Sequence, residues 1–155
     1  MRILCIASGG GHLEQLLACL DALEGHELAL AVYGFHSQGF KHPRFARQFR
    51  IFRGGDHLWL LLLGTILTVF QWAWILARFR PDVILSTGAE LAIVPFYLGR
   101  GLCGARCIFL ESAEYQTSPT RTGRWIYPAC NTFFVQSEVL LRHYGPKARY
   151  GGTLL

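Results

Sequence analysis

The feature that most constrains the fold of this chain is a glycine run between two apolar segments. Residues 2–7 are mostly apolar, and the turn that follows reads Ser8-Gly9-Gly10-Gly11. Leucines then recur at helical spacing, at positions 13, 16, 17, 20 and 23. A buried strand, a glycine turn and a helix form the first unit of a doubly wound α/β domain. Because glycines admit a ligand close to the backbone and a helix N-terminus offers unpaired N–H groups, this turn is typical of a phosphate site.

The rest of the chain continues this alternation. Short apolar runs predict six further strands, at residues 27–33, 49–53, 82–86, 106–110, 131–135 and 148–150. Helical patterns lie between them, and the polar stretches 35–48 and 113–123 are expected to be loops. We therefore predict one Rossmann-like domain over residues 1–155, with a parallel sheet of six to seven strands flanked by helices. The strands at 2–7 and 82–86 are expected to be neighbours, because the glycine turn after each must face one cleft.

Composition narrows the class of ligand. The net charge is +5, and of the 15 basic residues only Lys41 and Lys147 are lysines. Arginine suits bidentate phosphate contacts, which leaves nucleic acid, anionic lipid and a phosphorylated substrate open. The sequence has no basic run with interleaved aromatics and no zinc-finger spacing, so no nucleic-acid partner is predicted. The five cysteines are scattered and odd in number, which predicts reduced thiols and no metal site.

Residues 58–77 contain no charged side chain. A helix of this length could span a bilayer, but a single crossing would put the strands at 2–7 and 82–86 on opposite sides of the membrane. We therefore expect the helix to lie in the membrane interface. The side chains expected to contact the membrane there are Trp59, Trp72, Trp74 and Arg78. A fully buried core helix is the alternative, since the segment is apolar all round.

The residues around the glycine turn bear on which phosphate binds. The third glycine of a dinucleotide site is missing, and the second predicted strand ends in Tyr33-Gly34 rather than in an acidic residue, so NAD is disfavoured. No P-loop or nucleophile elbow is present, and no cofactor is predicted. His12 follows the glycines at a helix start, where the positive helix end favours a neutral imidazole. His12 could act as a general base beside a diphosphate, or it could cap the helix or only donate to phosphate.

Five short stretches, taken in order, resemble one glycosyltransferase family. They are Ser8–His12, Asp82–Ala89, Glu111-Ser112, Phe134–Gln136 and Tyr150–Gly152. They are similar to the membrane-anchoring subunit of the two-part UDP-N-acetylglucosamine transferase of lipid-linked oligosaccharide synthesis, and closer still to its bacterial relatives in capsule and exopolysaccharide synthesis. This family resembles the N-terminal, acceptor-binding half of a GT-B glycosyltransferase. Its eukaryotic members carry an N-terminal membrane anchor, which residues 58–77 are expected to replace here.

The resemblance implies a subunit that binds a polyprenyl-diphosphate-linked glycan and recruits a catalytic partner to the cytoplasmic face of the inner membrane. The partner would bind the UDP-sugar and supply the C-terminal half, and this chain would be inactive alone. The resemblance also implies catalytic roles for His12 and Glu111. The diphosphate would face Gly9, Gly10, Gly11, Ser86, Thr87, Gly88 and Ser112. A self-sufficient small glycosyltransferase and a non-catalytic membrane scaffold are the alternative functions.

Overall fold

The structure, a computed structural model, describes residues 1–33, 39–51 and 58–154, and for residues 58–65 it describes the backbone alone. Seven parallel strands form one sheet, in the order β3-β2-β1-β4-β5-β6-β7. The strands are β1 (Arg2–Ser8), β2 (Glu27–Tyr33), β3 (Phe45–Arg50), β4 (Val83–Ser86), β5 (Arg106–Leu110), β6 (Thr132–Val135) and β7 (Ala148–Tyr150). The predicted Rossmann-like α/β fold is confirmed.

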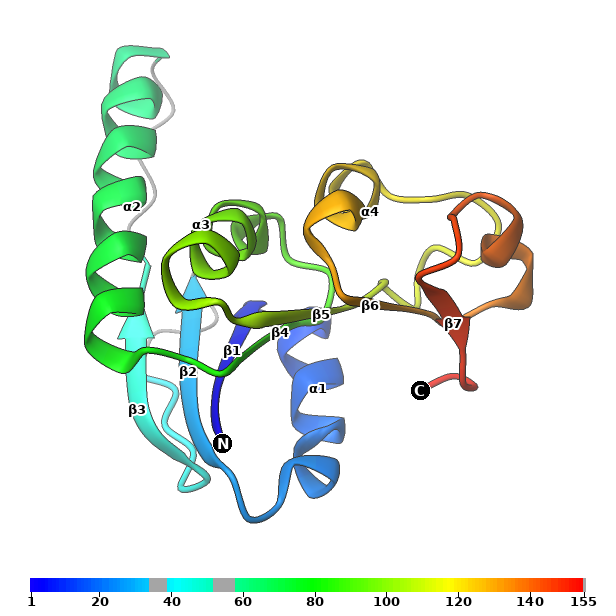
Figure 1. The fold of residues 1–155 in the computed structure, drawn as a ribbon, viewed down its shortest axis with the longest axis horizontal. Coiled ribbons are helices and arrows are strands. Elements are labelled where there is room, and N and C mark those ends of the chain that lie inside the picture. The colour runs from blue at the N-terminus through cyan, green and yellow to red at the C-terminus, as the bar shows by residue number, and fades with distance from the viewer. Residues whose placement is uncertain (34–38, 52–57, 155) are drawn as a thin grey trace.

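Helices cover both faces of this sheet. Helix α1 (Gly11–Ala18) lies on one face, and α2 (Leu58–Phe79), α3 (Ile93–Cys103) and α4 (Arg121–Ile126) lie on the other (Figure 1). The remaining helical turns are 3₁₀ segments: η1 (Leu20–Leu23), η3 (Glu90–Ala92), η4 (Tyr127–Ala129) and η5 (Glu138–Arg142). The switch in strand order falls between β1 and β4, which is where open α/β sheets place their ligands.

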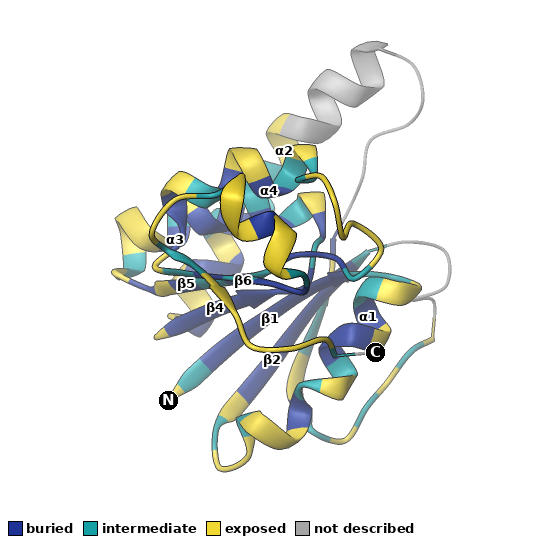
Figure 2. Ribbon diagram, turned by 90° about the vertical axis from the view of Figure 1, so that its right-hand side faces the viewer, coloured by how far each residue is buried: buried dark blue, intermediate teal, exposed yellow. Residues whose placement is uncertain are grey.

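The central strands are apolar because both of their faces are covered. Residues 3–7 of β1 and every residue of β4 are buried, as the dark centre of the sheet in Figure 2 shows. Strand β1 pairs with β2 along seven residues and with β4 from Ile3↔Val83 to Ile6↔Ser86. The predicted neighbourhood of these two strands is therefore confirmed, and it brings their carboxyl ends to the same edge of the sheet.

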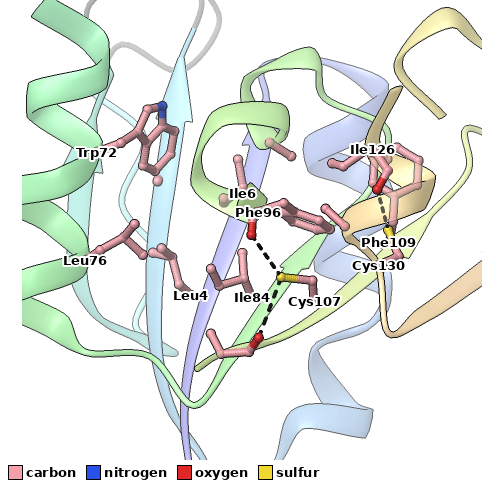
Figure 3. Close-up of a cluster of buried hydrophobic side chains, with 14 of the residues drawn as sticks. Leu4, Ile6, Trp72, Leu76, Ile84, Phe96, Cys107, Phe109, Ile126 and Cys130 are labelled. Carbon is pink, nitrogen blue, oxygen red and sulfur yellow. Dashed lines mark hydrogen bonds between the residues drawn. The ribbon is translucent and has the colours of Figure 1, made fainter. Parts of the chain in front are cut away.

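The larger core cluster lies under α2, α3 and α4 and is rich in aromatic rings. Figure 3 shows part of it, in which Phe96 meets Phe109 edge to face at a centroid distance of 6.2 Å. Cys107 and Cys130 are buried in this cluster as free thiols, and their Sγ–H groups donate to the Phe96 and Ile126 carbonyls. Burial raises the pKa of Cys107 to about 11 and that of Cys130 to about 12, which suits structural cysteines.

Two segments predicted as loops contain regular structure. Strand β3 begins at Phe45 rather than at residue 49, and an irregularity in its pairing with β2 lets Phe45 enter the core on the α1 side. Residues 52–53 of the predicted strand lie outside the described residues. Helix α4 begins at Arg121, where Thr120 caps it by accepting a hydrogen bond from the Gly123 N–H at 2.8 Å.

Candidate functional site

A cleft of about 500 Å³ opens at the carboxyl ends of β1, β4 and β5. Its lining combines residues on either side of the first glycine turn, Gly88 of the second, and the loop between β5 and α4. The lining residues are Ser8, His12, Tyr33, Gly88, Glu90, Ser112, Glu114, Tyr115, Pro119, Thr120, Arg121 and Thr122. Of the predicted site residues, His12, Gly88 and Ser112 line this cleft, whereas Gly9, Gly10 and Gly11 do not. Both carboxylates and the arginine of the lining were not predicted.

The glycine turn after β1 presents the start of α1 to this edge. Gly10 has a φ of +88°, a conformation that favours glycine, and precedes the first helical residue, Gly11. The Gly9 N–H donates to the Tyr33 carbonyl at 2.8 Å, so this group extends the sheet instead of facing a ligand. The N–H groups of Gly11 and His12 have no partner within the helix, as in any first helical turn. They and the positive helix end suit a phosphate.

The backbone conformation at Gly11 is helical and does not require glycine. A β-carbon at Gly11 would meet only Glu114 Oε1, at an ordinary contact distance of 3.8 Å. Alanine is the better residue in a helix by up to about 1 kcal/mol. The fold would therefore accept alanine at this position, and glycine leaves the backbone of the turn uncovered there.

His12 packs against the second glycine turn. A β-carbon on Gly88, which has a φ of +99°, would lie 2.5 Å from His12 Cε1 and 2.6 Å from its Nδ1. The Thr87 hydroxyl donates to the His12 carbonyl at 2.6 Å. Thr87 is thus buried and fixes the backbone of His12, and the prediction that Thr87 faces the ligand is wrong. The N-cap of α1 is Gly10 and carries no side-chain cap hydrogen bond, so His12 does not cap the helix.

Buried polar atoms without partners gather at this edge. Among the side chains that the structure describes, four buried polar atoms lack a hydrogen bond, and three of them are His12 Nδ1, Ser86 Oγ and Ser112 Oγ. Leaving such a group unsatisfied costs about 1–3 kcal/mol. Ser112 is only 2% exposed and lines the cleft, and its hydroxyl oxygen is itself buried. Ser86 is fully buried and does not line the cleft, which corrects its predicted contact with the ligand.

Glu111 has a different position from the one predicted. Its side chain is 0% exposed, and its carboxylate accepts hydrogen bonds from the Thr120 hydroxyl at 2.8 Å, from the Ser112 N–H at 3.2 Å and from the Tyr144 hydroxyl. Glu111 does not line the cleft, where the prediction placed it, and its catalytic role stays a prediction. Glu111 instead fixes both ends of the loop from Ser112 to Thr120, which forms one wall of the cleft.

Burial and hydrogen bonding to Glu111 also raise the pKa of Tyr144 well above its usual range. This hydroxyl therefore stays protonated at alkaline pH values at which a free tyrosine ionises, and it keeps donating to the carboxylate. Gly123 leaves room for the arrangement, because a β-carbon there would collide with the Tyr144 hydroxyl and with Glu111 Oε2. The wall of the cleft is thus tied to the C-terminal part of the fold.

Helix α2 divides into a buried and an exposed face. Trp72 is 0% exposed and packs with Leu76 and Phe79 in the core, so its predicted membrane contact is wrong. Trp74 is 57% exposed, and the other large apolar residues exposed on the described part of this helix are Ile66, Leu67 and Phe70. The predicted side-chain contact of Trp59 lies outside the described side chains. Because Trp72 and Trp74 are two residues apart on a helix, they point to different sides.

Two exposed arginines lie near Trp74. Arg78 is one turn further along the same helix. Arg47 lies on strand β3, where Phe49 meets the Trp74 ring edge to face, and its guanidinium is 5.9 Å from the centroid of the Phe79 ring of α2. We call Ile66, Leu67, Phe70 and Trp74 the α2 stripe. Among the residues that the structure describes, no helix combines the length and apolar character that a membrane crossing needs.

A second hollow is unsuited to phosphate. A groove of about 410 Å³ runs along the α1 face of β4, β5 and β6, between α1 and the C-terminal residues 151–154. Its walls are almost entirely apolar and include Leu85, Ile108 and Phe134. Apolar walls without donors do not stabilise a buried anion, so the polar cleft is the better candidate for a charged substrate.

No protein family model matches the sequence, and no curated protein matches it significantly. Solved structures do resemble it. MurG from Acinetobacter baumannii superposes with a TM-score of 0.76 at 15% identity, over 98% of this chain and 45% of MurG. The fold is that of a GT-B domain.

Two further GT-B proteins extend this comparison. A UDP-GlcNAc 2-epimerase from Methanocaldococcus jannaschii superposes with a TM-score of 0.69 at 14% identity, over 99% of this chain and 46% of the epimerase. The calicheamicin glycosyltransferase CalG4 superposes with a TM-score of 0.57 at 9% identity, over 98% of this chain and 52% of CalG4. The chain thus spans about half the length of each of these proteins. At such identities the likeness shows the fold, and the reaction has to be argued from the cleft.

Proposed function

We propose that this chain is the acceptor-binding and membrane-recruiting subunit of a two-component glycosyltransferase. It would take part in polysaccharide synthesis, where sugar passes from a UDP-sugar to a polyprenyl-diphosphate-linked glycan. The observation that carries the proposal is the cleft, which His12 and Ser112 line and beside which α1 begins at Gly11 without a side chain. This combination suits a diphosphate with a hydroxyl acceptor close to it.

In the proposed reaction, His12 takes the proton of the acceptor hydroxyl while that oxygen attacks C1 of the sugar. The bond between C1 and the UDP oxygen breaks, and UDP leaves on the partner's side. The backbone N–H groups of Gly11 and His12 and the Ser112 hydroxyl hold the acceptor diphosphate. Glu111 acts as a positioning residue through the loop that carries Ser112.

This chain corresponds to about half of MurG and of CalG4. The UDP-sugar site, the partner that carries it and the need for both chains belong to the proposal. The same fold also occurs in UDP-GlcNAc 2-epimerases, so epimerisation of the UDP-sugar is the competing reaction that an experiment must separate.

The test measures transfer of radiolabelled sugar from a panel of UDP-sugars to polyprenyl-diphosphate glycan in native membranes. It compares this chain alone, the chain with the product of the neighbouring gene, and the pair carrying His12→Ala. We expect activity only in the pair, and a loss of about a hundredfold or more with His12→Ala, because a general base contributes about that factor. Activity of this chain alone, or epimerised UDP-sugar without transfer, would contradict the proposal.

We further propose that the α2 stripe and its arginines attach the chain to the cytoplasmic face of the inner membrane. Exposed aromatic and aliphatic side chains next to arginines suit an anionic lipid surface. Phe70→Ser should weaken binding to vesicles of phosphatidylglycerol and phosphatidylethanolamine about tenfold, since a buried apolar side chain contributes about 1.5 kcal/mol. Leu102→Ser is the matched control, because Leu102 is as exposed but lies on α3. An equal effect of both variants would contradict the assignment.

A further inference from the structure

Two buried glutamines connect the helix that carries His12 to the end of strand β5. Gln15 lies on α1 and is 3% exposed, and Gln136 directly follows β6 and is 2% exposed. The Gln136 Nε2 group donates to Gln15 Oε1 at 3.1 Å and to the Glu111 carbonyl at 2.9 Å. Gln136 is 121 residues from Gln15 and 25 from Glu111, so the fold alone brings these groups together.

The carboxamide of Gln136 has one orientation in this contact. Its Oε1 atom accepts a hydrogen bond from the Leu154 N–H at 3.0 Å. Because an N–H donor requires an acceptor, the amide oxygen must face Leu154, and the amide nitrogen must face Gln15 and Glu111. The oxygen and the nitrogen therefore both have partners, and a buried polar network that is satisfied in this way favours a single arrangement of the elements it joins.

Both ends of the contact adjoin residues that line the cleft. On α1, Gln15 is three residues after His12, so the two side chains lie on the same side of the helix. After β5, Glu111 directly precedes Ser112. His12 Cε1 and Ser112 Cβ lie 2.5 and 3.4 Å from the position that a β-carbon would take on Gly88, so the two cleft residues are close neighbours. The glutamine contact thus joins the segments that bring His12 and Ser112 together.

The remaining contacts of α1 with the sheet include many apolar side chains, such as Leu13 and Leu16. Apolar packing is non-directional, whereas a hydrogen bond weakens steeply as its geometry changes. The Thr87 hydroxyl, which donates to the His12 carbonyl, fixes the helix start relative to β4. The bond between Gln15 and Gln136 fixes the same helix relative to β5 and β6. A pair of leucines would fill the space without this directionality.

We propose that Gln136 is a positioning residue, which holds His12 through Gln15 within reach of the acceptor hydroxyl. A general base acts only within hydrogen-bond distance of the proton it takes, and a displacement of about 1 Å can slow a reaction about a hundredfold. Gln136 does not line the cleft, so its effect passes through α1. This inference rests on the proposed function, which gives His12 the role of the base.

The experiment compares Gln136→Leu, Gln15→Leu and the double variant, each as the full chain with the proposed partner. Steady-state transfer separates kcat from the KM for the acceptor, and urea denaturation measures stability. We expect each single variant to lower kcat about tenfold with little change in KM, because the base is displaced while the acceptor site remains. The double variant should recover stability, since replacing both partners of a buried hydrogen bond by apolar groups is nearly neutral, but its kcat should stay low.

Asn131→Ala is the matched control. The Asn131 side-chain oxygen accepts a hydrogen bond from the Cys107 N–H at 2.8 Å, which also links β5 to the segment of β6 but at the other end of these strands. This variant should lose stability and keep its kcat. The inference is overturned if Gln136→Leu lowers kcat no more than Asn131→Ala, or if kcat recovers with stability in the double variant, as a purely structural role requires.

Amide resonances of the chain alone provide a readout that does not need the reaction. Gln136→Leu should shift the resonances of Gly11 and His12, whereas Asn131→Ala should leave them in place. Unchanged His12 resonances in Gln136→Leu also overturn the inference. If the wild-type pair transfers no sugar, the proposed function fails, and these shifts alone then decide whether Gln136 positions His12.

Discussion

The two glycine turns at the cleft differ in what glycine does for the fold. After β4, Gly88 has a φ of +99° and the His12 ring lies where its β-carbon would be. After β1, Gly10 also needs glycine for its φ of +88°, but Gly11 has a helical backbone with room for a side chain. Packing therefore requires glycine at position 88 in the turn after β4, whereas it does not require glycine at position 11 in the turn after β1. The difference separates residues that build the cleft from residues that leave it open for a ligand.

The largest expected effect is at the packed turn. Gly88→Ala should lower the free energy of unfolding by about 2–3 kcal/mol, because the positive φ strains alanine and the new methyl group displaces His12. Urea denaturation measures this change. Gly101→Ala is the control, since a β-carbon at Gly101 in α3 meets nothing within 4 Å. If Gly88→Ala were as stable as the control, the contrast between the two turns would be lost.

A smaller effect is expected from the Tyr144 hydroxyl, which donates to Glu111 at the wall of the cleft. Because the pKa of Tyr144 is raised in the folded state, its contribution to stability is complete below about pH 10, where the unfolded tyrosine titrates. The contribution is lost as the pH rises above that value towards the folded pKa. We expect the free energy of unfolding to fall by about 1 kcal/mol between pH 10 and pH 11.

Tyr144→Phe provides the comparison for this alkaline loss. It should cost about 1 kcal/mol at pH 8, because the hydrogen bond to Glu111 is removed, and it should flatten the alkaline dependence. Tyr127→Phe is the control, as its ring stacks on Tyr144 without a contact to the carboxylate. An alkaline loss of the same size in Tyr144→Phe would show that another group causes it.

The smallest change in stability is expected at the open turn. Gly11→Ala should leave the free energy of unfolding unchanged or raise it by about 0.5 kcal/mol, as for other glycines in helical backbone. Pyrophosphate affinity should nevertheless fall about tenfold, because the methyl group obstructs the approach to the N–H groups. Calorimetric titration and urea denaturation of the same sample measure both quantities. A parallel loss of stability and binding would mean that Gly11, like Gly88, serves the fold.

The sequence was sufficient for the parts of the molecule that depend on local pattern. The apolar run before Gly9 and the run at 82–86 identified β1 and β4, and the glycine after each correctly predicted that they are neighbours. The burial of Trp72 could not be predicted, because α2 is apolar on every side and its pattern does not distinguish the core face from the exposed face. Tertiary packing made that distinction.

Three cleft residues were named from the sequence: His12 from its place after the glycines, and Gly88 and Ser112 from the family resemblance. The structure brings these three residues together. The role of Glu111 depends on Thr120 and Tyr144, which lie 9 and 33 residues further along the chain, and no local pattern links them. Glu114 and Arg121 belong to a polar stretch without periodicity, so only the fold shows that they line the cleft.

The most direct test of the account is to find where this chain binds a prenyl diphosphate. Amide resonances of the full chain would be followed during titration with farnesyl diphosphate, with farnesol as the control that lacks the charge. The account predicts that farnesyl diphosphate, and not farnesol, shifts the resonances of Gly10, Gly11, His12 and Ser112 most strongly. Shifts confined to the apolar groove around Cys19, Ile108 and Leu154, or equal shifts with farnesol, would contradict a diphosphate site at the glycine turn.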